Sequence, residues 1–401
     1  MNRRKFLGNV LGGTAAVAAS STIFSSLSTP AVAAGKKKSV AIIGCGRMGQ
    51  YYTEVYRALP DAEVVAIAEW NDSRRPAVGK RFGITNLYKD VHSMLKEIVP
   101  DVAAIITPTK FMKDAVIACA EAGVKGVSTD KPIAARLSDA DAMVDACRKN
   151  NVVFAGGNLQ RAKFTLQHIA KRLHSGEFGD LRGATIHRFG GEISGGGCQH
   201  ISVLRLLAQA EVEDVIAWAS PPEALAREDD RGLKINGRFR MTSGLEVQVY
   251  GESTPYSGVD VWTDDTLIRW NWGAPQLFRG FDGKGARREV DPEYPPFPWQ
   301  NVLDDTPGLR PSDDYLVSSI RTFLDAVDAS SEDGLWISGH DLRQALEVAI
   351  ASKLSAQLGN QLVKLPLKDR SLVLYPSKYR WVGGDQAGRP QSVEEAAGVA
   401  N

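Results

Sequence analysis

The sequence of 401 residues contains only four cysteines, and no two of them have C-x-x-C spacing. This scarcity gives no basis for a disulfide framework or a cysteine metal site, so we expect buried free thiols and no metal. A formal net charge of +1 likewise gives no argument for binding to nucleic acid or to an anionic membrane surface. The cysteines are Cys45, Cys119, Cys147 and Cys198.

The N-terminal stretch lacks the strongly apolar character of a transmembrane helix, which needs about 20 mostly apolar residues. Gly, Ser, Thr and Ala dominate it up to Val32. It begins with Asn2-Arg-Arg-Lys-Phe-Leu-Gly8, which resembles a twin-arginine signal, and Ala31-Val-Ala33 fits an A-x-A cleavage site. We predict that residues 1–33 are a twin-arginine signal peptide, that the folded protein reaches the periplasm, and that no stable membrane insertion remains. The alternatives are an ordinary secretory signal and a retained anchor.

A glycine motif lies between a predicted strand, Val40 to Ile43, and a predicted helix, Gln50 to Leu59. It is G-x-G-x-x-G in the setting that a dinucleotide site requires. The first glycine permits a tight turn, the second lets the backbone approach a pyrophosphate, and the third lets helix and strand pack closely. N–H groups at the helix start then favour phosphate charge. The residues of the motif are Gly44, Cys45, Gly46, Arg47, Met48 and Gly49.

The next predicted strand, Glu63 to Ala68, ends at Glu69, which is 20 residues after Gly49 (69 − 49). An acidic residue at this place accepts the ribose hydroxyls of NAD. Arg74 or Arg75 could stack on the adenine or reach a 2′-phosphate, which the Glu69 carboxylate would repel. We therefore expect NAD rather than NADP. The alternative is a structural glycine turn in a protein that binds no nucleotide.

The pattern along the chain predicts an α/β fold with two domains. Strands and helices alternate from Val40 to Gly157, as in a doubly wound parallel sheet. Thr107-Pro108-Thr109 and Thr129-Asp130-Lys131-Pro132 follow two of the strands, at the edge where open α/β sheets bind ligands. We assign residues 36–157 to an N-terminal Rossmann domain.

After Gln160-Arg161 the pattern changes. Alternation over residues 212–272 predicts a large open, mostly antiparallel sheet. We assign residues 158–370 to a C-terminal α+β domain for substrate binding and oligomerisation, and residues 371–401 to a polar tail. Other expectations are a glycine-rich passage from Gly190 to His200, an irregular loop over 273–311, and helices over 138–149 with Ser138 as N-cap, 165–175, 201–208, 313–329 and 340–358.

The combined motifs resemble the glucose–fructose oxidoreductase/inositol dehydrogenase (Gfo/Idh/MocA) family. Besides the glycine motif, the likeness rests on Thr107-Pro108, Asp130-Lys131-Pro132, Gln160-Arg161, His200 before an apolar helix, and Ser338 to Val348. The resemblance implies that the open sheet forms the substrate floor and often the oligomer interface, so a homodimer or homotetramer is expected. It also implies a sugar or polyol substrate and cofactor contacts from the six motif residues, Glu69, Arg74, Thr107, Pro108, Asp130, Lys131 and Gln160.

The resemblance further implies two catalytic residues, Lys131 and His200. Lys131 would lie beside the nicotinamide and help take the proton of the reacting hydroxyl; the alternative is a surface or salt-bridging lysine. The family's Asp-x-x-x-His-x-x-Asp has Gly196 and Val203 at its acidic positions if His200 is the histidine. His200 would then act alone or with Glu192, and the alternative is a structural histidine at a helix start.

Three functions fit the sequence. The first is a periplasmic NAD(P)-dependent oxidoreductase of a sugar or sugar derivative, with a tightly held and internally recycled cofactor. The second is a redox-neutral, NAD-dependent glycosidase or lyase that uses transient oxidation, which the missing acid favours. The third is a non-catalytic protein that binds a nucleotide or a sugar.

Overall fold

The computed structural model describes residues 37–252, 254, 256–280 and 288–383, which belong to one compact unit. The predicted signal peptide, residues 1–33, and the end of the predicted tail lie outside the described residues. Within the described ranges, no helix is both long and apolar enough to span a bilayer, and no group of three or more His, Cys, Asp or Glu side chains could hold a metal ion. All four cysteines are buried free thiols, as predicted.

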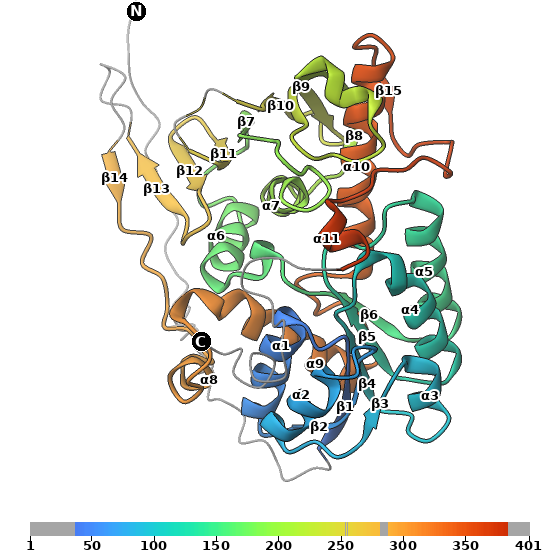
Figure 1. Ribbon diagram of the computed structural model, residues 1–401. Coiled ribbons are helices and arrows are strands. Elements are labelled where there is room, and N and C mark those ends of the chain that lie inside the picture. Colours follow the sequence, from blue (N-terminus) through green and yellow to red (C-terminus); the bar gives the residue numbers. More distant parts are fainter. Residues whose placement is uncertain (1–36, 253, 255, 281–287, 384–401) are drawn as a thin grey trace, which may run out of the picture. The chain divides into compact units, whose positions relative to one another are not determined.

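The first sheet of the described chain has six parallel strands in the order β3-β2-β1-β4-β5-β6, so the predicted doubly wound sheet is confirmed (Figure 1). All residues of β4, β5 and β6 are buried, as expected for a parallel sheet covered on both faces. The order reverses between β1 and β4, where such sheets bind ligands. The strands are β1 Lys38–Ile43, β2 Ala62–Ala68, β3 Leu87–Tyr88, β4 Val102–Ile105, β5 Gly126–Thr129 and β6 Val153–Gly156.

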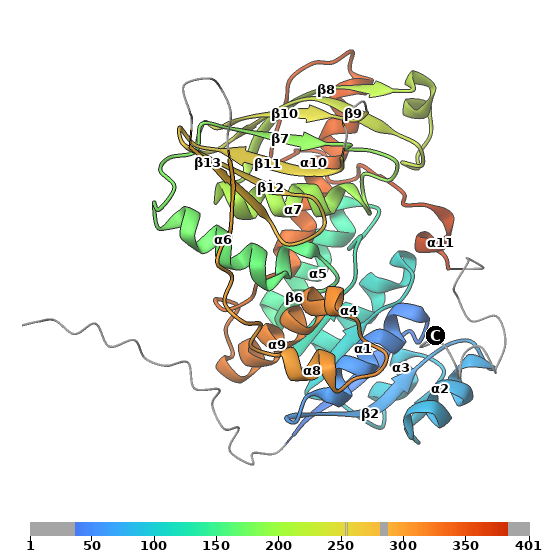
Figure 2. The same ribbon diagram turned by 90° about the vertical axis from the view of Figure 1, so that its left-hand side faces the viewer.

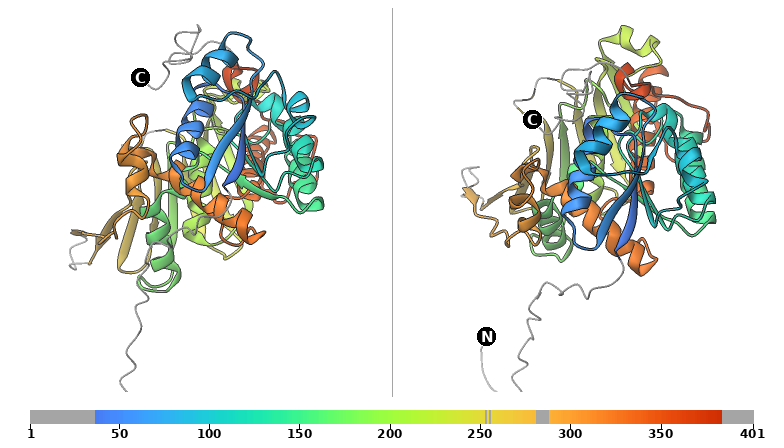
Figure 3. Two further views of the ribbon diagram at one scale, coloured as in Figure 1. Left: turned by 90° about the horizontal axis from the view of Figure 1, so that it is seen from below. Right: turned by 60° about the horizontal axis from the view of Figure 1, so that its bottom comes forward.

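Alternate side chains of β1 pack into two different hydrophobic clusters. Ala41 and Ile43 join the cluster that contains residues of α4 and α5, whereas Val40 and Ile42 join the cluster of α1, α2 and α9. Helix α9, which is distant in sequence, thus packs beside α1 on the Rossmann sheet (Figure 3). The helices are α1 Arg47–Ala58, α2 Arg74–Phe82, α3 Val91–Leu95, α4 Met112–Glu121, α5 Leu137–Lys149 and α9 Asp314–Ala329.

The second sheet has nine strands in the order β14-β13-β12-β11-β7-β10-β9-β8-β15. Only β7 and β10 pair in parallel, so the prediction of a mostly antiparallel sheet is confirmed for the described residues. The strands are β7 Gly183–His187, β8 Val212–Ser220, β9 Lys234–Met241, β10 Glu246–Tyr250, β11 Gly258–Trp262, β12 Thr266–Trp270, β13 Gln276–Arg279, β14 Arg288–Val290 and β15 Val363–Lys364.

One face of this sheet is covered by helices, with α7 and α10 lying beneath the strands (Figure 2). Burial therefore alternates along β9, where every second residue is buried. The remaining elements are α6 Phe164–His174, α7 Gly197–Ala208, α8 Gln300–Asp304, α10 Gly339–Gln357, α11 Lys378–Trp381, and the short 3-10 turns η1 Thr109–Phe111, η2 Gln160–Ala162, η3 Pro222–Ala226 and η4 Pro311–Asp313.

Three sequence predictions are wrong in detail. The predicted irregular loop over residues 273–311 contributes β13 and β14 to the sheet edge and contains α8. Helix α7 begins at Gly197, inside the glycine-rich passage, and not at Ile201 as predicted. A Cβ at Gly197 would lie 2.7 Å from the Phe189 ring, so only glycine allows this close packing of the first turn. Helix α5 begins at Leu137 with Arg136 as N-cap, so Ser138 does not cap it.

Backbone hydrogen bonds hold the C-terminal segment at the start of α5. The N–H groups of Leu137 and Ser138 donate to the carbonyl oxygens of Leu372 and Arg370, at 3.2 and 2.8 Å. These orphan N–H groups of a helix start are thus satisfied by the C-terminal segment instead of by a capping side chain. The segment is held along α5, and α11 follows it.

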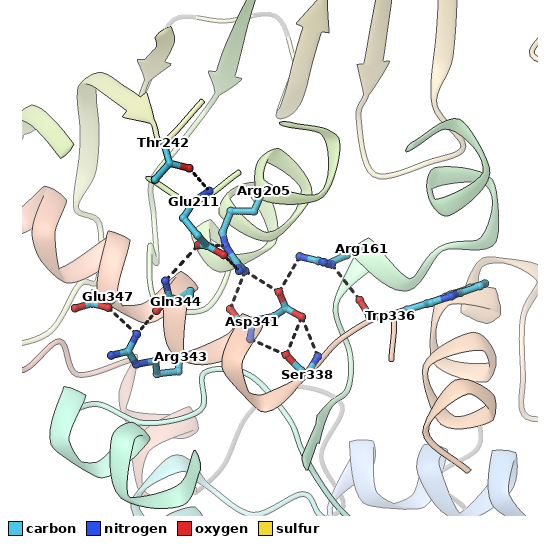
Figure 4. A network of polar contacts seen from close by, with 10 residues as sticks. All are labelled: Arg161, Arg205, Glu211, Thr242, Trp336, Ser338, Asp341, Arg343, Gln344 and Glu347. Carbon is cyan, nitrogen blue, oxygen red and sulfur yellow. Dashed lines mark hydrogen bonds and ion pairs between the residues drawn. The ribbon is translucent and has the colours of Figure 1, made fainter. Parts of the chain in front are cut away.

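A buried ion pair network joins η2, α7 and α10 (Figure 4). Oδ1 of Asp341 accepts hydrogen bonds from Arg161 at 2.9 Å and Arg205 at 2.8 Å. Oδ2 accepts the N–H of Ser338, whose hydroxyl caps α10 in return. Burial raises the pKa of Asp341, but Arg161 and Arg205 outweigh burial and hold it below its usual range.

We predict that Asp341→Ala destabilises the fold by about 3–5 kcal/mol, because it leaves two buried guanidinium groups without their shared carboxylate. Thermal and urea unfolding would measure the loss. Asp325→Ala is the matched control, since Asp325 also pairs with a buried arginine, Arg321, but is itself 61% exposed and should cost at most about 1 kcal/mol. Equal losses in the two variants would contradict this role of Asp341.

Candidate functional site

A cavity of about 870 Å³ lies at the carboxyl ends of the strands of the Rossmann sheet. Eleven of the predicted site residues line it, and three, Cys45, Gln160 and His200, do not. The structure therefore brings together residues from five separate segments. Those that line the cavity are Gly44, Gly46, Arg47, Met48, Gly49, Glu69, Arg74, Thr107, Pro108, Asp130 and Lys131.

The three glycines of the motif have different surroundings. Gly44 has φ +91°, and a Cβ there would lie 2.6 Å from the carbonyl oxygen of Ile106. A Cβ at Gly49 would overlap the carbonyl oxygen of Gly44. At Gly46, by contrast, no atom lies within 4 Å of the Cβ position, although the residue lines the cavity. Gly44 and Gly49 are thus required by packing, whereas Gly46 leaves open space that a ligand can approach.

Glu69 fixes the glycine loop from the end of β2. It is 2% exposed, and its Oε2 accepts the N–H of Cys45 at 2.7 Å. Its Oε1 accepts the N–H of Asn71 at 2.9 Å and lies 3.6 Å from Nη1 of Arg74. A carboxylate oxygen can accept two hydrogen bonds, so Glu69 has capacity left to bind a ligand hydroxyl while it holds the loop. The Cys45 side chain is buried and does not line the cavity, and its predicted cofactor contact stays a prediction.

Asp130 and Lys131 follow β5 and Asn158 follows β6, and all three line the cavity. Asp130 accepts the backbone N–H of Lys131 at 2.6 Å and the side-chain amide of Asn158 at 3.2 Å. Burial raises the pKa of Asp130. Burial also lowers the pKa of Lys131, and the positive charge of Arg380 lowers it further. The Lys131–Pro132 peptide bond is cis.

The C-terminal segment supplies cavity residues that the sequence did not reveal. Tyr379, Arg380, Val382 and Gly383 line the cavity. Nε of Arg380 donates to Oε2 of Glu192 at 2.8 Å. The sequence patterns indicated only a polar tail here; no motif marks these residues, and the tertiary fold alone brings them to β5.

His200 lies outside the cavity lining, in the first turn of α7. Its ring packs edge-on against Phe189, Trp270 and Trp272, and its Nε2 is 3.1 Å from the hydroxyl of Ser257. Burial lowers the pKa of His200 to about 4, so the ring is neutral at physiological pH. Glu192, its predicted partner, pairs with Arg380 instead. A catalytic role of His200 stays a prediction.

Gln160 and Arg161 lie at the junction of the two sheets. The backbone N–H of Gln160 donates to Oε1 of Gln199 at 2.7 Å, and Arg161 donates to Asp341. Arg161 therefore holds the fold together there, and the predicted cofactor contact of Gln160 stays a prediction.

Residues 38–157 match the model of a protein family described as oxidoreductase family, NAD-binding Rossmann fold (GFO_IDH_MocA). The chain is 33% identical over 144 residues to D-apiose dehydrogenase of Paraburkholderia graminis, covering 36% of this chain and 38% of that one. It is 27% identical over 140 residues to myo-inositol 2-dehydrogenase of Thermotoga maritima, covering 35% and 42%. The chain thus matches about two fifths of the length of these curated relatives.

The fold extends further than the sequence match. The structure of a levoglucosan dehydrogenase in complex with NADH and L-sorbose superimposes with a TM-score of 0.67 at 20% identity, and the match covers 83% of this chain and all of that one. The likeness therefore extends beyond residues 38–157 and shows that the two chains share a fold.

We predict that, in protein stripped of bound nucleotide, Gly49→Ala lowers the melting temperature strongly, whereas Gly46→Ala leaves it within the error of the wild type. The added methyl group overlaps backbone at Gly49 and meets open space at Gly46. Calorimetric unfolding of both variants is the test. A strong destabilisation by Gly46→Ala would show that Gly46, too, is required by packing.

Proposed function

We propose that the protein is an NAD-dependent oxidoreductase of the Gfo/Idh/MocA type that acts on a sugar, a polyol or a derivative of one. The observation that carries the proposal is the presence of Lys131, with its lowered pKa, in the same cavity as the glycine loop. The match of residues 38–157 to an NAD-binding family supports it. So do the sequence relatives, whose names describe apiose and inositol dehydrogenases.

The residues of the cavity fit a dinucleotide. Gly46 offers backbone with open space in front of it, at the N-terminus of the 12-residue helix α1, whose free N–H groups favour a pyrophosphate. Glu69 has acceptor capacity for ribose hydroxyls, and its negative charge disfavours a 2′-phosphate. The cavity is also of the size that binds small ligands.

NAD, when bound, supplies the acceptor for the hydride that leaves the carbinol carbon of the substrate. Lys131 takes the hydroxyl proton at Nζ. The carbinol thus loses a hydride from carbon and a proton from oxygen and becomes a carbonyl. A lysine does this as a neutral amine, and burial together with the nearby Arg380 favours that form. Asp130 and Asn158 hold the backbone from which Lys131 projects.

We also propose that the protein is exported by the twin-arginine route with its cofactor already bound and recycled in place. Residues 1–33 carry this proposal by their sequence alone. Export of a folded protein agrees with four buried thiols and no need for disulfides. Oligomerisation through the open sheet stays a prediction.

Protein purified from the periplasm without added nucleotide should release NAD or NADH in stoichiometric amount when it is denatured. Absorbance and mass spectrometry of the released material are the measurement. The matched Gly46→Ala variant should be purified largely free of nucleotide. Protein that releases no nucleotide, and that shows no binding of added NAD by calorimetry, would refute the oxidoreductase proposal. Nucleotide in protein found only in the cytoplasm would refute export and leave the enzyme intact.

Lys131→Met should lower kcat/KM by about a hundredfold to ten-thousandfold, the range of general base catalysis, while the variant still binds NAD. The matched control is Lys125→Met, since Lys125 is a 68% exposed lysine that pairs with Asp101 and does not line the cavity. Because the neutral amine is the base, the rate should rise with pH through a pKa below the ordinary 10.5. The groups that set this pKa are Arg380, Cys198, Asp130 and Glu192. An unchanged rate in Lys131→Met would exclude Lys131 as the base.

A further inference from the structure

Two basic side chains from segments far apart in the sequence line the same cavity. Lys131 follows β5, and Arg380 belongs to α11; both line the cavity. They are close enough that the charge of Arg380 is, after burial, the largest cause that lowers the pKa of Lys131. Burial raises the pKa of Asp130, which weakens the compensating negative charge beside Lys131. The guanidinium group of Arg380 stays positively charged even when Lys131 is a neutral amine, so it can attract an anion into this part of the cavity.

Arg380 is held in place by contacts on one edge and one face of its guanidinium group. Its Nε donates to Glu192, and the Tyr379 ring centroid lies 4.9 Å from its Cζ atom. Glu192 is itself fixed, because its Oε1 accepts the N–H and the hydroxyl of Ser377 at 3.1 and 2.7 Å. An arginine held in this way loses little side-chain entropy when it binds a ligand.

The other edge of the guanidinium group is available to a ligand. Within the part of the chain that the structure describes, Nη1 and Nη2 of Arg380 make no hydrogen bond, whereas Nε does. Two parallel N–H groups on one edge match the two oxygens of a carboxylate. The side chain is 25% exposed, and it lines the cavity.

We propose that Nη1 and Nη2 of Arg380 bind a carboxylate of the substrate, so that the substrate is a sugar acid or another carboxylated polyol. This inference rests on the proposed function and deepens it by naming the substrate class. The carboxylate is assigned to the substrate and not to the nucleotide because Arg380 lies beside the proposed base. The phosphate-binding features, Gly46 and the start of α1, belong to a different strand end. Glu192 and Ser377 act as positioning residues through Arg380.

The experiment uses matched acid and neutral compounds: D-glucuronate with D-glucose, D-galacturonate with D-galactose, and D-gluconate with D-glucitol. Each is titrated by calorimetry into the full mature protein loaded with NAD. We expect at least one acid to bind at least tenfold more tightly than its neutral partner. Arg380→Met should remove this preference, a loss of roughly tenfold to a hundredfold in acid affinity, with NAD affinity unchanged.

Arg380→Lys should restore only part of the preference, because lysine keeps the charge but not the two parallel donors. Arg148→Met is the matched control, since Arg148 is 78% exposed on α5, and it should behave as the wild type. Thermal unfolding of each variant shows whether α11 has been disturbed.

The proposal is overturned if no acid binds at millimolar concentration, if acids bind no better than their neutral partners, or if Arg380→Met keeps the preference. It is also overturned if Arg380→Met weakens NAD binding instead, which would assign Arg380 to the nucleotide. Failure of the protein to bind NAD at all would refute the proposed function separately. The same acid titrations on the nucleotide-free protein would then still decide whether Arg380 binds carboxylates.

Discussion

The close approach of α1 to β1 at the glycine loop is the constraint on which the site depends. Gly49 lies so near the carbonyl oxygen of Gly44 that no side chain fits between them. The turn is then fixed from the other side, where the buried carboxylate of Glu69 accepts the N–H of Cys45. These contacts place the start of α1 at the cavity wall, where no atom lies within 4 Å of the Cβ position of Gly46. Packing therefore requires Gly44 and Gly49, whereas Gly46 faces open space in the cavity.

The C-terminal half of the chain returns to the Rossmann sheet twice, and the second return supplies part of the cavity wall. Helix α9 packs beside α1 and completes one face of that sheet. The segment after β15 pairs with the start of α5 and then places α11 against the cavity. Because Asp341 ties η2, α7 and α10 together, the junction between the two sheets is held by buried charges as well as by apolar packing.

The sequence allowed the nucleotide half of the site to be predicted to a large extent. Gly44, Gly46, Gly49, Glu69, Thr107, Pro108, Asp130 and Lys131 all line one cavity, as their positions at strand ends suggested. The prediction worked because parallel strands bring their carboxyl ends to a common edge, so that sequence position implies spatial position. The rest of the site could not be predicted from the sequence. Arg380 carries no motif, and the pairing of Glu192 with Arg380 instead of His200 depends on a contact between residues 188 positions apart.

The sequence by itself determined the local elements: the strand–glycine–helix unit, the acid at the end of β2, and the alternation that makes one sheet parallel and the other mostly antiparallel. Periodicity and turn chemistry are properties of neighbouring residues, so they can be recognised without a structure. Only the tertiary structure decided which charges share the cavity. Burial and the nearby charge of Arg380 lower the pKa of Lys131. His200 lies among aromatic rings outside the cavity lining. Both outcomes depend on long-range packing, which brings distant segments together and excludes water from them.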